Sequence, residues 1–149
     1  MASIEDLLAA RRLEAVRPDS AAAQAFLDDA RTHLENASLI LERDDTNGAY
    51  ALGYDAARKA ATAHMRLSGF RLRNRPRAHQ AVVDYARAML DDPTTGEALA
   101  NLDRIRRTRH ASENRAGHID AAQAAEDIRL IGIIVDAVRG ALAEYRDGE

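Results

Sequence analysis

The 149-residue sequence contains no cysteine and no tryptophan, and its only lysine is Lys59. Without cysteine the chain can form neither a disulfide nor a thiolate metal site, which is typical of proteins in a reducing compartment. The most apolar stretch, LIGIIVDAV, is too short to cross a bilayer. The segment MASIEDLLAARR lacks the basic start and apolar core of a signal peptide. We therefore expect a soluble, cytoplasmic protein with no membrane association.

Residues that favour strands are scattered, and no run alternates apolar and polar side chains with a period of two. Apolar residues instead recur every three or four positions, as in amphipathic helices. The predicted fold class is all-α, an up-and-down four-helix bundle with additional short helices and no strands. The length suits a single domain, 1–149, with a short N-terminal helix and linker in 1–18 and the bundle in 19–146.

Turn and capping residues place the ends of the expected helices. Ser3 with Asp6 predicts a capped start for a first helix over 4–12, and Thr94 with Glu97 predicts another capping box. Gly69 is typical of the residue that ends a helix. The remaining helices are expected over 20–43, 46–68, 78–90, from the Thr94 box into the 104–115 stretch, and 121–145.

The last expected helix is apolar on two faces. One face carries Ala124, Ile128, Ile131, Val135, Val138, Leu142 and Tyr145, and the second carries Leu130, Ile133, Ile134 and Ala137. Such a helix either lies at the centre of the bundle or shares a face with a partner. We favour the partner surface, which predicts a homodimer or a complex.

Charge is distributed unevenly along the chain. Residues 58–115 carry thirteen basic and six acidic side chains, whereas both flanks are acidic and the net charge is −3. A basic region between acidic flanks can attract a polyanion. Arginine also outnumbers lysine twenty to one. That bias can reflect a GC-rich coding sequence, so arginines alone are weak evidence of function.

The arginines form two clusters. RLRNRPR contains Arg71, Arg73, Arg75 and Arg77, and we interpret it either as a solvated basic loop or as a set of forked phosphate contacts. The second cluster, RIRRTRHASENR over 104–115, adds Arg106 and Arg107 as candidate nucleic-acid contacts. Its ordinary explanation is cations placed favourably at a helix C-terminus.

Helical geometry singles out one arginine of the second cluster. Leu99, Leu102 and Arg109 fall on the same helix face, whereas Arg104 and Arg107 point elsewhere. An arginine that continues an apolar face needs a carboxylate, helix carbonyls, a partner chain or a substrate phosphate. Arg109 is therefore the strongest candidate for a functional arginine.

Metal and cofactor chemistry has no support in the sequence. The five histidines form no His-x-x-x-His or Glu-x-x-His pair, and the glycines form no phosphate-binding loop. His33 lies on an apolar stripe and is better explained as a histidine at the edge of the core. We expect neither a metal nor a cofactor.

These features together resemble the HEPN superfamily, the higher eukaryotes and prokaryotes nucleotide-binding domains. The resemblance lies in LDRIRRTRHASEN before the last long helix and in the tyrosine- and alanine-rich GAYALGYDAARKA. It implies a dimeric four-helix bundle that cleaves RNA without metal through an arginine followed, after four to six residues, by a histidine. The RNA 2′-hydroxyl would attack the adjacent phosphate while histidine moves protons and arginine stabilises the developing charge.

The motif can be placed in two ways, which the sequence leaves open. Arg104 and His110 have the literal spacing. Arg109 followed by His110 fits the arginine-plus-polar pair, and Asn114 then stands in the histidine's place, where it cannot transfer protons. The candidate catalytic residues are therefore Arg104, Arg109, His110 and Asn114.

Three functional hypotheses follow. The first is an RNA-directed protein, either a toxin-type ribonuclease or a relative that no longer cleaves. The second is a non-enzymatic interaction module that pairs with a nucleotidyltransferase-like antitoxin partner. The third is a plain dimeric bundle whose arginines reflect composition alone.

Overall fold

The computed structural model describes residues 1–73, 76–114 and 117–148. The described elements, in chain order, are α1 (Ile4–Ala9), β1 (Leu13–Ala15), α2 (Ser20–Glu42), α3 (Thr46–Ser68), β2 (Phe70–Leu72), α4 (Ala78–Met89), α5 (Gly96–Asn114) and α6 (Ala121–Asp147). The predicted all-α helical bundle is confirmed. Within the described ranges, no helix combines the length and apolar character needed to cross a bilayer.

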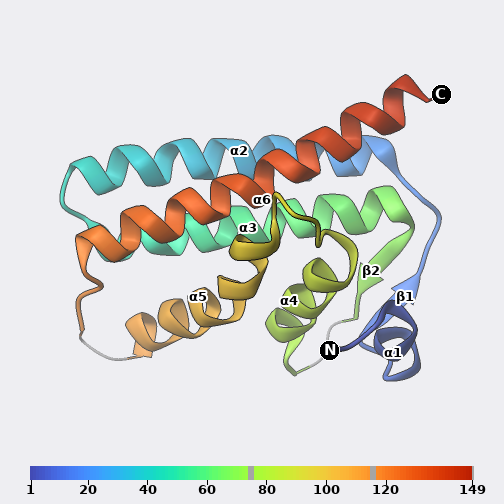
Figure 1. Ribbon diagram of the computed structural model, residues 1–149, viewed down its shortest axis with the longest axis horizontal. Coiled ribbons are helices and arrows are strands. Elements are labelled where there is room, and N and C mark those ends of the chain that lie inside the picture. Colours follow the sequence, from blue (N-terminus) through green and yellow to red (C-terminus); the bar gives the residue numbers. More distant parts are fainter. Residues whose placement is uncertain (74–75, 115–116, 149) are drawn as a thin grey trace.

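Three long helices form the main layer of the molecule. Helices α2 and α3 make an antiparallel hairpin, and α6 packs against both of them (Figure 1). Helix α4 runs away from the lower edge of the view, and α5 returns toward it, so the start of α4 and the end of α5 lie along that edge (Figure 1). This arrangement brings Arg77, at the start of α4, to the same side of the bundle as the second half of α5.

Alanine sets the spacing between the long helices. The buried residues of α3 include six alanines, and each is at most 2% exposed: Ala49, Ala56, Ala57, Ala60, Ala61 and Ala63. Small side chains allow neighbouring helix backbones to approach closely and lose little conformational entropy on burial. Larger residues from α6, such as Ile131 and Ile134, fill the same core cluster.

Helix α6 takes the central position that its two apolar faces also allowed. Leu130 and Ile134 are buried, and Ile133 and Ala137 are half-buried, through contacts with α2, α3 and α5. The large apolar side chains that are exposed in the described chain do not belong to this second face: they are Met1, Leu39, Met89 and, near the end of α6 on its first face, Tyr145. The second face of α6 therefore does not provide the partner surface that we expected from the sequence.

Local signals predicted several helix ends correctly. Ser3 and Asp6 form a reciprocal capping box at the start of α1, and Gly69 ends α3 in the left-handed conformation with φ of 87°. The Thr94–Glu97 capping box was wrong. Asp92 instead accepts hydrogen bonds from the backbone N–H groups of Thr94 and Thr95, at 2.7 and 2.9 Å.

The prediction that the chain has no strands was also wrong. The short strands β1 and β2 pair antiparallel, with Leu13 opposite Leu72 and Ala15 opposite Phe70. The first helix correspondingly ends at Ala9, before the predicted Arg12. The N-terminal segment is therefore a structured element that holds the chain where α3 leads toward α4.

Candidate phosphate-binding site

Arg109 lies at the boundary between the core and a surface cleft. Its guanidinium carbon is 6.0 Å from the centroid of the Tyr54 ring, on the α3 side of α5. The guanidinium group also forms an ion pair with Glu113, one turn further along the same helix. The Arg109 Nε atom is buried and has no hydrogen-bond partner among the described residues. This half-buried position agrees with the inward direction predicted from the helix face.

Arg104 has a different environment, which the sequence did not predict. It points toward α6, where Nη2 lies 2.7 Å from Asp127 Oδ1 and Nη1 lies 3.0 Å from Oδ2. The Asp127 side chain is fully buried and also accepts hydrogen bonds from Tyr50 Oη at 2.7 Å and Gln123 Nε2 at 3.0 Å. Arg104 therefore stabilises the packing of α5 on α6.

The pKa of Asp127 reflects these donors. Burial favours the neutral carboxyl and would raise the pKa, but the hydrogen bonds from the three surrounding side chains outweigh it. The pKa of Asp127 consequently lies below its ordinary value. Burial, followed by the nearby Asp127 carboxylate, raises the pKa of Tyr50. Asp127 is therefore a buried carboxylate whose charge is balanced by Arg104.

A cleft of about 540 Å³ lies between α3, the start of α4 and the second half of α5. We call it the arginine cleft, and its lining residues are Tyr54, Arg77, His79, Gln80, Arg106, Arg109, His110 and Glu113. Three of these side chains are guanidinium groups, and Glu113 is the carboxylate among them. Such a lining favours an anion with several oxygen atoms.

His79 also lines this cleft, although the sequence places no second histidine or glutamate at a metal-binding spacing from it. Its Nδ1 atom lies 3.4 Å from Tyr54 Oη, and the two rings stack with centroids 6.0 Å apart and an angle of 28°. The signal that could have identified it is its place two residues after Arg77, where the first arginine cluster leads into a helix.

His110 and Asn114 occupy different places at the end of α5. His110 is exposed and lines the arginine cleft beside Arg109. Asn114 is outside the cleft lining and donates from Nδ2 to the His110 backbone oxygen at 3.0 Å. Neither placement of the motif brings both of its residues into the cleft. Arg104 is bound to Asp127 and is separated from His110, and Asn114 is hydrogen-bonded to the backbone of its own helix and is separated from Arg109.

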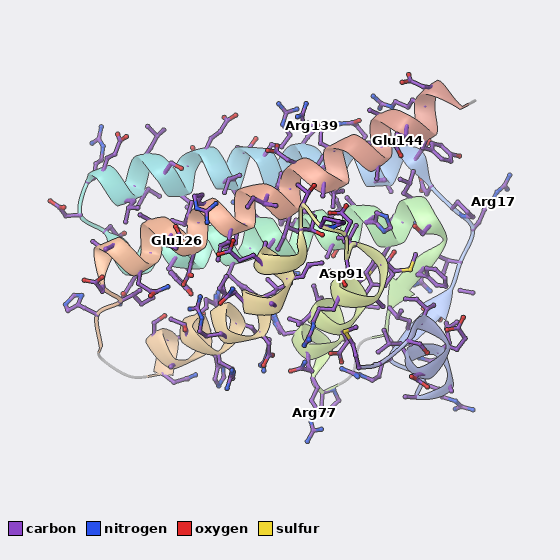
Figure 2. All side chains as sticks on the ribbon, viewed as in Figure 1. Arg17, Arg77, Asp91, Glu126, Arg139 and Glu144 are labelled. Carbon is purple, nitrogen blue, oxygen red and sulfur yellow. The ribbon has the colours of Figure 1, made fainter. Side chains whose placement is uncertain are left out.

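The first arginine cluster is not one continuous surface. Arg71 pairs with Glu14 across the small sheet at 2.7 Å, and the Arg73 backbone N–H donates to Arg12 at 3.1 Å. Arg75 lies outside the described residues. Arg77 alone of the described members lines the arginine cleft. It lies at the start of α4, on the opposite side of the molecule from Arg139 and Glu144 (Figure 2).

Arg106 and Arg107, the candidate contacts of the second cluster, both pair with Asp103. The nitrogen–oxygen distances are 3.0 Å for Arg106 and 3.3 Å for Arg107. Arg106 also lines the cleft, whereas Arg107 lies outside its lining and its side chain is 67% exposed. The described residues contain no group of three or more His, Cys, Asp or Glu side chains that could hold a metal ion.

No protein-family model, no curated protein and no solved structure matches this chain. The fold and the site together define a helical bundle with an arginine-lined cleft at one edge.

Proposed function

We propose that this chain is an RNA-directed protein of the HEPN type, a cytoplasmic endoribonuclease that acts without metal in the arginine cleft. The observation that carries the proposal is that Arg77, Arg106 and Arg109 line one cleft together with His79 and His110. Guanidinium groups bind phosphate oxygens through two parallel hydrogen bonds, and imidazoles transfer protons near neutral pH.

The backbone of α4 adds to the attraction for phosphate. Arg77 stands at the N-cap of α4 and has no side-chain hydrogen bond to the first helical turn. The free N–H groups of a helix N-terminus attract anions, and here they accompany the cationic side chains of the cleft. A phosphodiester held at this point contacts α4 and α5 at once.

The chemistry requires a cation at the phosphate and a group that transfers protons. In the proposed reaction Arg109 stabilises the charge of the pentacoordinate phosphate, and the neighbouring His110 transfers a proton. Arg104 has no part in this chemistry because its guanidinium group is already hydrogen-bonded to the Asp127 carboxylate.

The test is cleavage of mixed-sequence RNA in the presence of EDTA. Arg109→Ala and His110→Ala should each abolish the cleavage that the wild type performs. Arg139→Ala is the matched control, since Arg139 is exposed on the opposite side of the molecule (Figure 2). Cleavage that persists in both cleft variants contradicts the proposal.

The partners of this function are also proposals, and the resemblance of the sequence supports them. They are a second copy of the chain, or a nucleotidyltransferase-like antitoxin. Because most of the apolar side chains on both faces of α6 are buried or half-buried within the chain, we expect either partner to bind mainly through another surface. The mass in solution, measured with and without the product of the adjacent gene, should show a dimer or a mixed complex, and a monomer in both measurements contradicts both partners.

A further inference from the structure

His79 approaches the arginine cleft from a different helix than Arg109 and His110. It is the second residue of α4, and its side chain is exposed at the cleft surface. The bulk of Tyr54 is buried beneath it, so the stacked phenol ring fixes the position of the imidazole. Two histidines from two helices therefore line the same cleft.

The contact with Tyr54 defines what the two ring nitrogens can do. Nδ1 faces Tyr54 Oη at 3.4 Å. Burial raises the pKa of Tyr54 to about 12, so the phenol stays neutral and its oxygen can accept a hydrogen bond. In the tautomer whose Nδ1–H donates to this oxygen, Nε2 carries a lone pair and can accept a proton from a ligand.

Charged groups around His79 favour its neutral form. Arg58 approaches from α3, Arg106 and Arg109 from α5, and Glu113 is the acidic group that faces it; Arg77 precedes it on its own segment. Burial first, and then the three arginines Arg58, Arg109 and Arg106, lower the pKa of His79, and Glu113 opposes them. At neutral pH the imidazole is therefore in the form that accepts a proton.

We propose that His79 is the general base of RNA cleavage in this cleft, and that His110 is the general acid. This inference rests on the proposed ribonuclease function and assigns the second proton-transfer group that function needs. His79 thereby supplies the chemistry that Asn114 cannot.

The step balances in atoms and charge. Nε2 of His79 takes the proton of the ribose 2′-hydroxyl as the 2′-oxygen forms a bond to the adjacent phosphorus. The bond from phosphorus to the 5′-oxygen breaks, and His110 gives its proton to that leaving oxygen. The products are a 2′,3′-cyclic phosphate and a 5′-hydroxyl, and no metal or oxidant takes part.

The direct test compares His79→Gln with His110→Gln, and His118→Gln serves as the control. His118 is exposed and does not line the arginine cleft. With EDTA present, His79→Gln should lose about 10²-fold or more in cleavage rate, as expected for removal of a general base. It should bind a non-cleavable 2′-O-methyl RNA as tightly as the wild type, and His118→Gln should match the wild type in both measurements.

The pH dependence separates a base from a merely structural residue. The wild-type rate should rise with pH as His79 loses its proton, and this rise should disappear in His79→Gln. Tyr54→Phe removes the oxygen that orients the imidazole, so its kcat should fall several-fold at an unchanged KM. An identical melting temperature shows that each variant folds.

The outcomes distinguish this inference from the function on which it rests. If His79→Gln cleaves at the wild-type rate with the wild-type pH profile while His110→Gln does not cleave, the role of His79 is overturned and the ribonuclease stands. If the wild type binds RNA without cleaving it, both the base and the cleavage are overturned, and RNA binding stands. If it does not bind RNA either, the proposed function fails as a whole.

Discussion

Arg104 and Arg109 lie five residues apart on α5 and have opposite roles. The guanidinium group of Arg104 is held by two oxygens of a fully buried carboxylate on α6. Arg109 has one exposed carboxylate, Glu113, as its partner, and its Nε is unpaired among the described residues. A ligand can therefore replace the partner of Arg109, whereas the partner of Arg104 belongs to the core.

Removal of Arg104 should destabilise the fold strongly. In Arg104→Ala the buried Asp127 carboxylate loses its cation, and we expect the free energy of unfolding to fall by about 3 kcal/mol. Arg107→Ala is the matched control, since its side chain is 67% exposed and should change stability by at most about 0.5 kcal/mol. Urea unfolding measures both, and equal losses in the two variants would refute the structural role of Arg104.

The same carboxylate should make stability depend on pH. Because the pKa of Asp127 is lowered in the folded state, its contribution is fully present above the unfolded carboxyl pKa of about 4. That contribution is lost as the pH falls through the lowered folded pKa. Unfolding curves between pH 7 and pH 2 should show this decline, and Asp127→Asn should show a smaller one. An unchanged decline in Asp127→Asn would mean that other carboxylates dominate.

Glu113 should compete with phosphate for Arg109. In Glu113→Gln the internal partner loses its charge, so the affinity for 2′-O-methyl RNA should rise about two- to fivefold, the range set by an exposed ion pair. Glu126→Gln breaks the comparable pair with Arg129, outside the cleft lining, and should leave RNA affinity unchanged. Fluorescence anisotropy measures both, and weaker binding by Glu113→Gln would count against a competing role.

At the scale of elements, the junction of α3, β2 and α4 positions the first arginine cluster. Gly69 ends α3 with φ of 87°, and its carbonyl accepts a hydrogen bond from the Val16 N–H at 2.9 Å. A Cβ atom at Gly69 would lie 3.0 Å from the Val16 oxygen and 3.2 Å from Pro18 Cγ. The turn therefore requires glycine for both its backbone conformation and its space.

Two glycine substitutions should change stability in opposite directions. Gly69→Ala should lower the free energy of unfolding by about 1–2 kcal/mol, because alanine is strained in the left-handed region and meets the neighbouring backbone. Gly140→Ala should raise it by about 0.5–1 kcal/mol, since Gly140 is in the interior of α6 and a Cβ there meets open space. Urea unfolding checks the pair, and a stabilised Gly69→Ala would contradict the turn geometry.

The elements differ in how far the sequence predicts them. The caps at Ser3 and Gly69 are predictable because each depends on residues within one or two turns. The sheet is not, because each strand has three residues, too few for a visible period, and its partner comes from the other side of the α2–α3 hairpin. Pairing between distant segments leaves no periodic signal in either of them.

The residues of the candidate site also differ in how far the sequence predicts their positions. Helical spacing predicts the inward side of Arg109, because that is a property of α5 alone. It does not predict the Arg104–Asp127 pair or the place of His79, because both depend on how α5 packs against α6 and α4. Helix packing angles are set by the whole core, so these contacts are visible only in the fold.

At the scale of the whole molecule, the arginine cleft is a basic site on a chain with a net charge of −3. The acidic remainder repels RNA, so contact is favoured at the cleft, and binding depends on the release of counterions. We expect affinity for 2′-O-methyl RNA to fall steeply as salt is raised.

The contribution of a single cleft arginine should be measurable from this dependence. Arg77→Ala should reduce the slope of log affinity against log salt by about 0.7–1, the value for one lost phosphate contact. Arg71→Ala is the control, since Arg71 pairs with Glu14 outside the cleft lining and should leave the slope unchanged. A slope that is flat in the wild type would contradict phosphate binding.

The small sheet also has a consequence for the order of folding. Its strands β1 and β2 lie on either side of the α2–α3 hairpin in the chain, and that hairpin brings their ends together. Closing a loop is costly in entropy until its interior is ordered, so we expect the hairpin to form before the sheet. We therefore expect the small sheet, which fixes the chain at the end of α3, to form only after the α2–α3 pair has assembled.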